Sequence, residues 1–141
     1  MRAAALDDAV AAVAPIVADV RARGDNALLE WTERFDGPRP DGFRVSAREI
    51  AEARVDDDVL EALRRMIDAV RRFSEAQLPA DTEVEAVPGI VCERRWLPLD
   101  SVGLCVPSGR APLPSSLVMT AVPAQVAGVR RIAVVTPTPV A

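Results

Sequence analysis

The sequence contains no histidine and no lysine, since all 17 of its basic residues are arginines. The missing imidazole excludes a histidine general base, a Ser-His or Cys-His nucleophile pair and a histidine metal ligand. The missing lysine excludes a Schiff-base amine and the lysine of a phosphate-binding loop. Carboxylates, two thiols, hydroxyls and main-chain groups are what remains for any chemistry.

Cysteine is also scarce, and Cys92 and Cys105 are too far apart for a zinc knuckle or a thioredoxin-like pair. We expect two reduced, partly buried thiols in a cytosolic protein. Asp7 and Asp8 interrupt any signal-peptide core, and no apolar run approaches the length of a membrane span. The net charge of −4 gives no electrostatic footprint for nucleic acid. The expected location is therefore the cytoplasm, with neither a membrane nor a nucleic acid as partner.

Length and composition suit a globular protein that changes character along the chain. With 141 residues, half of them hydrophobic, it has the size of one ordinary domain, which buries roughly two-thirds of its unfolded surface. Residues 1–78 hold 16 acids and 12 arginines, whereas residues 79–141 hold five of each and nine of the twelve prolines. We therefore divide the chain at Leu78-Pro79 into a helical segment, 1–78, and an apolar segment, 79–141.

The beginning of the helical segment shows two amphipathic helices. Apolar residues recur at helical spacing from Leu6 to Val20, and Gly24 is placed to end this helix. Pro15 interrupts the pattern, which predicts either a kink or two short helices that meet. A second helix with Trp31 on its apolar face is closed by residues 36–38.

Two more helices are expected before residue 78. Ser46 and Glu49 form the capping box of a short one. The longest helix of the chain is predicted from about residue 59 to residue 77. Residues 56–58 are three aspartates near its start, where the helix dipole favours anions, and we interpret them as a cap and solvated face rather than a metal site. The predicted inward face of this helix consists of Leu60, Leu63, Ile67, Val70 and Phe73.

The apolar segment is predicted to form strands and one helix. Residues 83–87 alternate, Pro88-Gly89 turns the chain and residues 90–96 return it, which predicts a β-hairpin. A strand over 102–106, a loop, a helix and a strand over 132–135 then form a βαβ unit, which requires parallel strands. The helix is expected to begin at residue 114 or 115 and to end at residue 128. The predicted class is therefore α/β: an N-terminal helical arm, a β-hairpin and the start of a parallel sheet.

The loop between the first strand of this unit and its helix is the stretch with chemical character. It follows the carboxyl end of a parallel strand, where ligands bind in open α/β sheets. Gly109 would let the backbone approach a ligand, and Ser115 and Ser116 lie where the N–H groups of a helix point outward. These residues indicate contact with an anion or a nucleotide phosphate. The alternative is a stiff loop whose serines merely cap the helix.

The same region resembles the signature of the histidinol dehydrogenase family, G-L-Y-V-P-G-G-x-A-x-Y-P-S-S-V-L-M-x-A-x-P-A-x-V-A-G-V. The opening helices also resemble the family's V-R-x-x-G-D-x-A-L and F-D pattern. The resemblance extends from about Val10 to Pro139, and it is most specific between Gly103 and Gly128. The residues that carry it are Asp19-Val20-Arg21, Gly24-Asp25, Ala27-Leu28, Phe35-Asp36, Phe73, Gln77, Glu93-Arg94, Val102-Gly103-Leu104, Val106-Pro107, Gly109, Ala111-Pro112, Pro114-Ser115-Ser116, Met119, Ala121, Pro123-Ala124 and Ala127-Gly128-Val129.

This resemblance implies a zinc-dependent enzyme that oxidises L-histidinol twice, through the aldehyde, to L-histidine and reduces two NAD. It further implies homodimers with shared active sites and incomplete Rossmann-like domains, in histidine biosynthesis. The cofactor-binding residues that it carries over are Cys105, Pro107, Ser108, Gly109, Ser115 and Ser116.

Three family positions differ here, and they put cofactor binding in doubt. Cys105 replaces the family's tyrosine, which lies against NAD, and a thiol supplies neither an aromatic face nor a phenolic hydroxyl. Ser108 replaces the first of two glycines, and Phe73-Ser74 replaces a Phe-His pair. We assign no catalytic and no metal-binding residue, because the family's zinc ligands and its Glu-His acid/base pair lie further along the chain than Ala141.

We therefore expect an N-terminal part or truncated relative of histidinol dehydrogenase that is inactive alone and binds neither NAD nor zinc well. One alternative is a non-catalytic binding or oligomerisation module. Another is one half of a split dehydrogenase for a different amino alcohol or polyol, with a complementary C-terminal chain as partner. A parallel sheet that stops after two strands leaves apolar surface uncovered, which predicts self-association, such as a dimer through the long helix or an exposed strand.

Overall fold

The computed structural model describes residues 2–37, 42–107 and 113–137, and the chain divides into two compact units, Met1–Ala53 and Arg54–Ala141. Helix 57–76 belongs to the second unit because it packs against the helix of the βαβ unit. The boundary predicted from composition, Leu78-Pro79, differs from the boundary between these two compact units. It remains a prediction about how the chain is organised. Among the described residues, no helix has the length and apolar character needed to cross a membrane.

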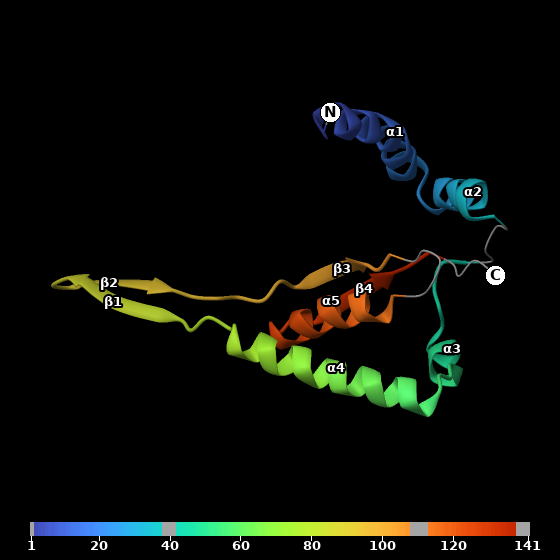
Figure 1. The fold of residues 1–141 in the computed structure, drawn as a ribbon. Coiled ribbons are helices and arrows are strands. Elements are labelled where there is room, and N and C mark those ends of the chain that lie inside the picture. The colour runs from blue at the N-terminus through green and yellow to red at the C-terminus, as the bar shows by residue number, and fades with distance from the viewer. Residues whose placement is uncertain (1, 38–41, 108–112, 138–141) are drawn as a thin grey trace. The chain divides into compact units, whose positions relative to one another are not determined.

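The first unit consists of α1 (Arg2–Arg23), α2 (Asp25–Asp36) and α3 (Ala47–Glu52) (Figure 1). Pro15 lies inside α1, so the prediction of two short helices that meet there is wrong. A proline removes one N–H donor from a helix, and here the helix continues past that loss. With 22 residues α1 exceeds the 20-residue α4 (Asp57–Ala76), which corrects the prediction that the latter is the longest helix.

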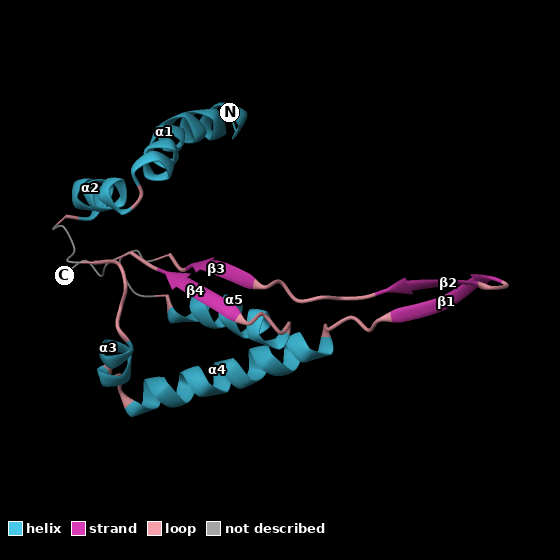
Figure 2. Cartoon of the chain, turned by 180° about the vertical axis from the view of Figure 1, so that it is seen from behind, coloured by secondary structure: helices cyan, strands magenta, loops and turns pink. Residues whose placement is uncertain are grey.

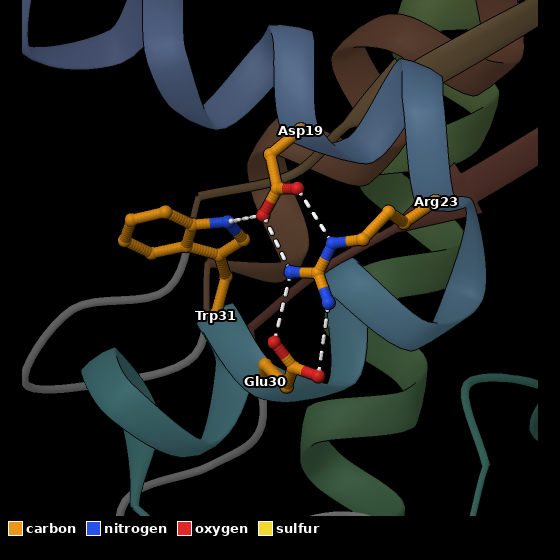
Figure 3. A network of polar contacts seen from close by, with 4 residues as sticks. All are labelled: Asp19, Arg23, Glu30 and Trp31. Carbon is orange, nitrogen blue, oxygen red and sulfur yellow. Dashed lines mark hydrogen bonds and ion pairs between the residues drawn. The ribbon is translucent and has the colours of Figure 1, made fainter.

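The junction of α1 and α2 is fixed by one guanidinium group (Figure 3). Arg23 binds Asp19 through two hydrogen bonds of 2.7 Å, and it binds Glu30 at 3.0 and 2.8 Å. The indole Nε1–H of Trp31 donates to Asp19 Oδ2 at 2.8 Å. The chain reverses at Gly24, whose φ of +59° is accessible to glycine at little cost. Among the residues of α1 and α2 whose burial the structure describes, Ala27 alone is buried, so polar contacts carry much of this junction.

These contacts shift the pKa values of the groups involved. Hydrogen bonds from Arg23, and then from Trp31, lower the pKa of Asp19 from 3.8 to about 2. Hydrogen bonds to Asp19 and Glu30 raise the pKa of Arg23. In the predicted capping box of α3, which is confirmed, Ser46 hydrogen bonds lower the pKa of Glu49.

The second unit contains the remaining helices and all described strands (Figures 1 and 2). Its elements are α4 (Asp57–Ala76), β1 (Thr82–Val87), β2 (Ile90–Arg94), β3 (Ser101–Cys105), α5 (Pro114–Val126) and β4 (Arg131–Val135). β1 and β2 form the predicted antiparallel hairpin, with Gly89 at a φ of +83° in its turn, although β2 ends at Arg94 rather than at residue 96. A bulge between Glu85 and Val87 shifts the register.

The predicted βαβ unit is confirmed, because β3 pairs with β4 in parallel from Ser101↔Arg131 to Cys105↔Val135. The pairing extends one bond beyond β3, where the Val106 N–H donates to the Val135 carbonyl at 2.8 Å. The α/β class with a helical arm, a hairpin and a parallel sheet is therefore confirmed.

The core of the second unit lies where α5 meets β3 and α4. Val106, Val118 and Val122 are buried, and four of the five apolar residues predicted to face inward from α4 are half-buried. The fifth prediction is wrong, because Phe73 is 70% exposed. Phe73 keeps the helical period, but it lines an open groove between α4 and α5 instead of packing in a core.

The expected extent of burial is not reached. The chain exposes 11886 Å², whereas a compact monomer of this mass exposes roughly 7,100 Å² and its unfolded chain roughly 22,000 Å². Less than half of the unfolded surface is therefore buried, so the expectation of two-thirds is wrong. The reason is visible in the side chains, since 25 large hydrophobic residues among those described are exposed.

We predict that the α1–α2 junction resists acid down to about pH 2. Because the folded pKa of Asp19, about 2, lies below its ordinary value of 3.8, its contribution is complete above that value and is lost as the pH falls through about 2. In a Trp96→Phe protein, Trp31 fluorescence should change with a midpoint near that pH. Asp19→Asn should abolish the transition, and a midpoint near the ordinary carboxyl pKa would contradict this assignment.

We also predict that Val122→Ala destabilises the second unit by about 1–3 kcal/mol, because it removes buried methyl groups between α5 and its neighbours. Met119→Ala, on the exposed side of the same helix, should cost about 0.5 kcal/mol or less. Urea unfolding followed by far-ultraviolet circular dichroism measures both. Equal losses would show that Val122 is not part of a core.

Candidate functional site

The predicted cofactor-binding residues begin at the carboxyl end of β3. Cys105 is the last residue of the strand and is exposed, and the exposed Pro107 follows the buried Val106. Val106 is held by its hydrogen bond to β4, so the direction in which the chain leaves the sheet is fixed. Ser108 and Gly109 lie outside the described residues.

On the other side of this loop, Pro114 opens α5 and Leu113 precedes it without a side-chain cap. Ser115 and Ser116 are half-buried in the first turn. The Ser116 N–H donates to the Leu113 carbonyl at 3.0 Å, which tightens this turn. Neither serine is the N-cap residue of α5, because Leu113 occupies that position. The alternative of a stiff loop concerns residues outside the described ones and stays a prediction.

The topology brings these residues to one end of the βαβ unit. The carboxyl ends of β3 and β4 and the first turn of α5 lie at the same end in both views (Figures 1 and 2). Main-chain N–H groups and serine hydroxyls beside a helix N-terminus suit an anion such as a phosphate. The described part of this site offers the exposed Cys105 thiol and the hydroxyls of Ser115 and Ser116 as its polar side-chain groups. The assignment of the six residues to cofactor binding stays a prediction.

Zinc does not fit the donor groups of the described residues. No three of their cysteine and acidic side chains gather as a metal site would require. Cys92 lies in β2 and Cys105 in β3, and both thiols are exposed, contrary to the expectation that they are partly buried. Asp56 occupies the N-cap position of α4 but makes no side-chain cap hydrogen bond, and Asp58 accepts a hydrogen bond from the Val59 N–H at 2.8 Å in the first turn.

A groove between α4 and α5, with a volume of about 610 Å³, was missed by the sequence reasoning. It includes none of the six predicted residues. Phe73 and Met119 line it. The sequence analysis had placed Phe73 on the inward face of its helix and Met119 among the residues that resemble the family. Its walls are apolar, so it offers hydrophobic contact rather than reactive groups. The lining residues are Ala69, Val70, Phe73, Ser74, Gln77, Leu78, Met119, Pro123 and Val126.

Known proteins similar to this chain agree on one family. The family model described as histidinol dehydrogenase matches residues 1–141. The histidinol dehydrogenase of Photobacterium profundum is 48% identical over 133 residues, which are 93% of this chain and 30% of that protein. The histidinol dehydrogenase of Gluconobacter oxydans is 47% identical over 131 residues, 90% of this chain and 30% of that protein.

A solved structure shows the same relation. The crystal structure of histidinol dehydrogenase from Elizabethkingia anophelis superposes on this chain with a TM-score of 0.83 at 31% sequence identity. The superposition covers 89% of this chain and 29% of the solved chain. The chain thus spans about 30% of the length of the curated relatives it matches. Since the family model matches every residue, the chain belongs to the histidinol dehydrogenase family.

Proposed function

We propose that this chain is the amino-terminal part of a zinc-dependent, NAD-linked histidinol dehydrogenase, which oxidises L-histidinol in two steps to L-histidine in histidine biosynthesis. The observation that carries the proposal is the match of 93% of this chain to only 30% of a histidinol dehydrogenase. The proposed location is the cytoplasm.

In this proposal, the carboxyl end of β3 and the first turn of α5 contact NAD in a Rossmann-like domain. NAD would supply the hydride acceptor. The chain's own residues would bind and orient it: Pro107 and the fixed Val106 direct the loop, and Ser115 and Ser116 present hydroxyl and N–H groups to a phosphate. Cys105 stands where the family has a tyrosine, so one wall of the nucleotide site would lack an aromatic ring.

Chemistry would depend on a further polypeptide segment. The sequence has no imidazole, and the described carboxylates and thiols form no metal cluster. A zinc ion and an acid/base pair would therefore come from the part of the relatives that this chain does not match. We propose that the chain alone does not turn over histidinol, and that it associates with itself.

The exposed apolar surface favours a second candidate, a non-catalytic binding or oligomerisation module. Such a module would associate without binding NAD. Enzyme assays with a complementary segment distinguish the two candidates.

We predict that the purified chain gives no histidinol-dependent NADH with NAD and zinc present. Addition of the segment of the Photobacterium profundum relative that follows the matched region should restore turnover, because that segment would supply the missing metal and proton-transfer groups. The complementary segment alone is the control. Turnover by the chain alone would refute the proposed incompetence, and failure of the mixture would favour the second candidate.

We further predict that Cys105→Tyr strengthens NAD binding measured by calorimetry. A stacked aromatic ring contributes about 0.5–1.5 kcal/mol, equivalent to roughly a 2- to 13-fold gain in affinity. Cys92→Tyr, at the other exposed thiol, is the matched control and should give no gain. Equal effects of both substitutions would contradict the placement of NAD at the end of β3.

A further inference from the structure

Helix α4 carries two apolar stripes, and α5 covers one of them. Leu60, Leu63, Ile67 and Val70 form the covered stripe, which is half-buried, and α5 is the described element against which α4 mainly packs. The second stripe repeats at spacings of four, three, four and three residues, the heptad pattern of a helix that packs lengthwise against another helix. We call this stripe the outer seam, and it consists of Ala62, Met66, Ala69, Phe73 and Ala76.

The outer seam is open to solvent. Its three alanines are exposed, Phe73 is 70% exposed and Met66 is half-buried. Ala69 and Phe73 line the groove between α4 and α5, and Met119, which is 65% exposed, lines it from α5. The two helices lie side by side in both views (Figures 1 and 2). Contiguous exposed apolar surface of this kind marks an interaction site more often than scattered hydrophobic residues do.

The shape of this surface suits a helix. Met119, Pro123 and Val126 follow one another at spacings of four and three residues on the α5 side of the groove, so both of its walls are ridges of helical side chains. A third helix can place its own apolar residues, at the same spacing, between such ridges. The alanines of the outer seam alternate with larger side chains, which leaves hollows for the side chains of that helix.

The charges beside the outer seam indicate what its partner carries. Asp58, Arg65 and Arg72 occupy successive equivalent positions on the side of the seam away from α5, and the two arginines are those that flank Ala69. Arg65 forms an ion pair with Glu61 at 3.6 Å, and such an exposed pair contributes little. In an antiparallel pair of identical seams, Arg65 of one copy would oppose Arg72 of the other and repel it. The charges therefore favour an acidic helix over a second copy of this chain.

The exposed surface indicates that this partner is larger than one helix. Two separate compact domains with the lengths of the two units would together expose roughly 8,500 Å², but the chain exposes 11886 Å². The excess of roughly 3,400 Å² is several times the 800 Å² or so that each partner contributes to a standard protein interface. The histidinol dehydrogenase of Photobacterium profundum matches this chain over only 30% of its length, so its remaining part has the size that such a partner requires.

We propose that the outer seam and the groove beside it bind an amphipathic helix with carboxylates along its flank, and that this helix belongs to the part of histidinol dehydrogenases that this chain does not match; this rests on the proposed function above. The apolar residues of that helix would cover Phe73 and Met119, and its carboxylates would meet Arg65 and Arg72. Helix α4 would then lie between two helices. The self-association proposed above would use another surface.

Two arginines on opposite sides of α4 provide a matched test, with the complementary segment of the Photobacterium profundum relative as the probe in a calorimetric titration. Arg72 flanks the outer seam, whereas Arg64 lies on the far side of the helix, and both are exposed. Arg72→Glu should raise the dissociation constant at least about threefold, because an attraction becomes a repulsion. Arg64→Glu should leave it unchanged. Equal effects of the two substitutions overturn the proposal.

Removal of an apolar anchor should have a larger effect. Phe73→Ala should raise the same dissociation constant at least about tenfold, since aromatic residues buried in an interface carry much of its binding energy. The chain alone should keep its stability toward urea, because this side chain is 70% exposed. A dissociation constant that does not change in Phe73→Ala overturns the proposal.

A thiol placed in the outer seam reports directly whether the seam is covered. In an Ala69→Cys protein, maleimide modification of position 69, followed by peptide mass spectrometry, should slow at least about tenfold when the complementary segment is bound, because a thiol must be accessible to react. In an Arg64→Cys protein, the modification of position 64 should not depend on the segment. Protection of position 69 by high concentrations of this chain alone would assign the outer seam to a second copy and overturn the proposal.

Binding and turnover are measured separately, so the outcomes distinguish this proposal from the proposed function. A mixture that binds through the outer seam but produces no NADH refutes the dehydrogenase assignment and supports the seam as the interface. A segment that restores turnover and binds the parent and the Phe73→Ala and Arg72→Glu variants equally well refutes the seam alone. A segment that does not bind the parent overturns the proposal.

Discussion

The packing of α5 between β3 and α4 is the constraint on which the second unit depends. Val118 and Val122 are buried in α5, and Val106 is buried where the chain leaves the sheet. Because these valines fix the helix against the strands, they also fix its first turn beside the end of β3. Ser115 and Ser116, which we propose contact NAD, are thus positioned by buried valines of the core. Site geometry and core stability are therefore coupled in this unit.

Local sequence signals predicted most of the elements. Ser46 and Glu49 specified a helix start, Pro88-Gly89 specified a turn, and Gly24 specified a helix end, because each signal acts through atoms a few residues away. The parallel pairing of β3 and β4 followed from the strand–helix–strand order. The family signature pointed to the end of β3, the loop that follows it and the first turn of α5.

The predictions that were wrong depended on which elements lie beside a residue in the folded chain. Phe73 keeps the helical period of α4, but period shows which residues share a side and not whether another element covers that side. The predictions of partly buried thiols and of two-thirds burial were wrong for the same reason. The effect of Pro15 was uncertain for a different reason, since a proline can bend a helix without ending it. The bulge in β1 has no local signature, because it depends on pairing with β2.

That bulge makes Ala86 the residue of β1 that the pairing can lose. In a regular ladder the residue directly after Glu85 would pair with Ile90, and the bulge gives that place to Val87. Deletion of Ala86 would therefore bring Val87 directly after Glu85, where it would still pair with Ile90 on the side of Val84. Related sequences should accordingly accept either a residue or a deletion between Glu85 and Val87.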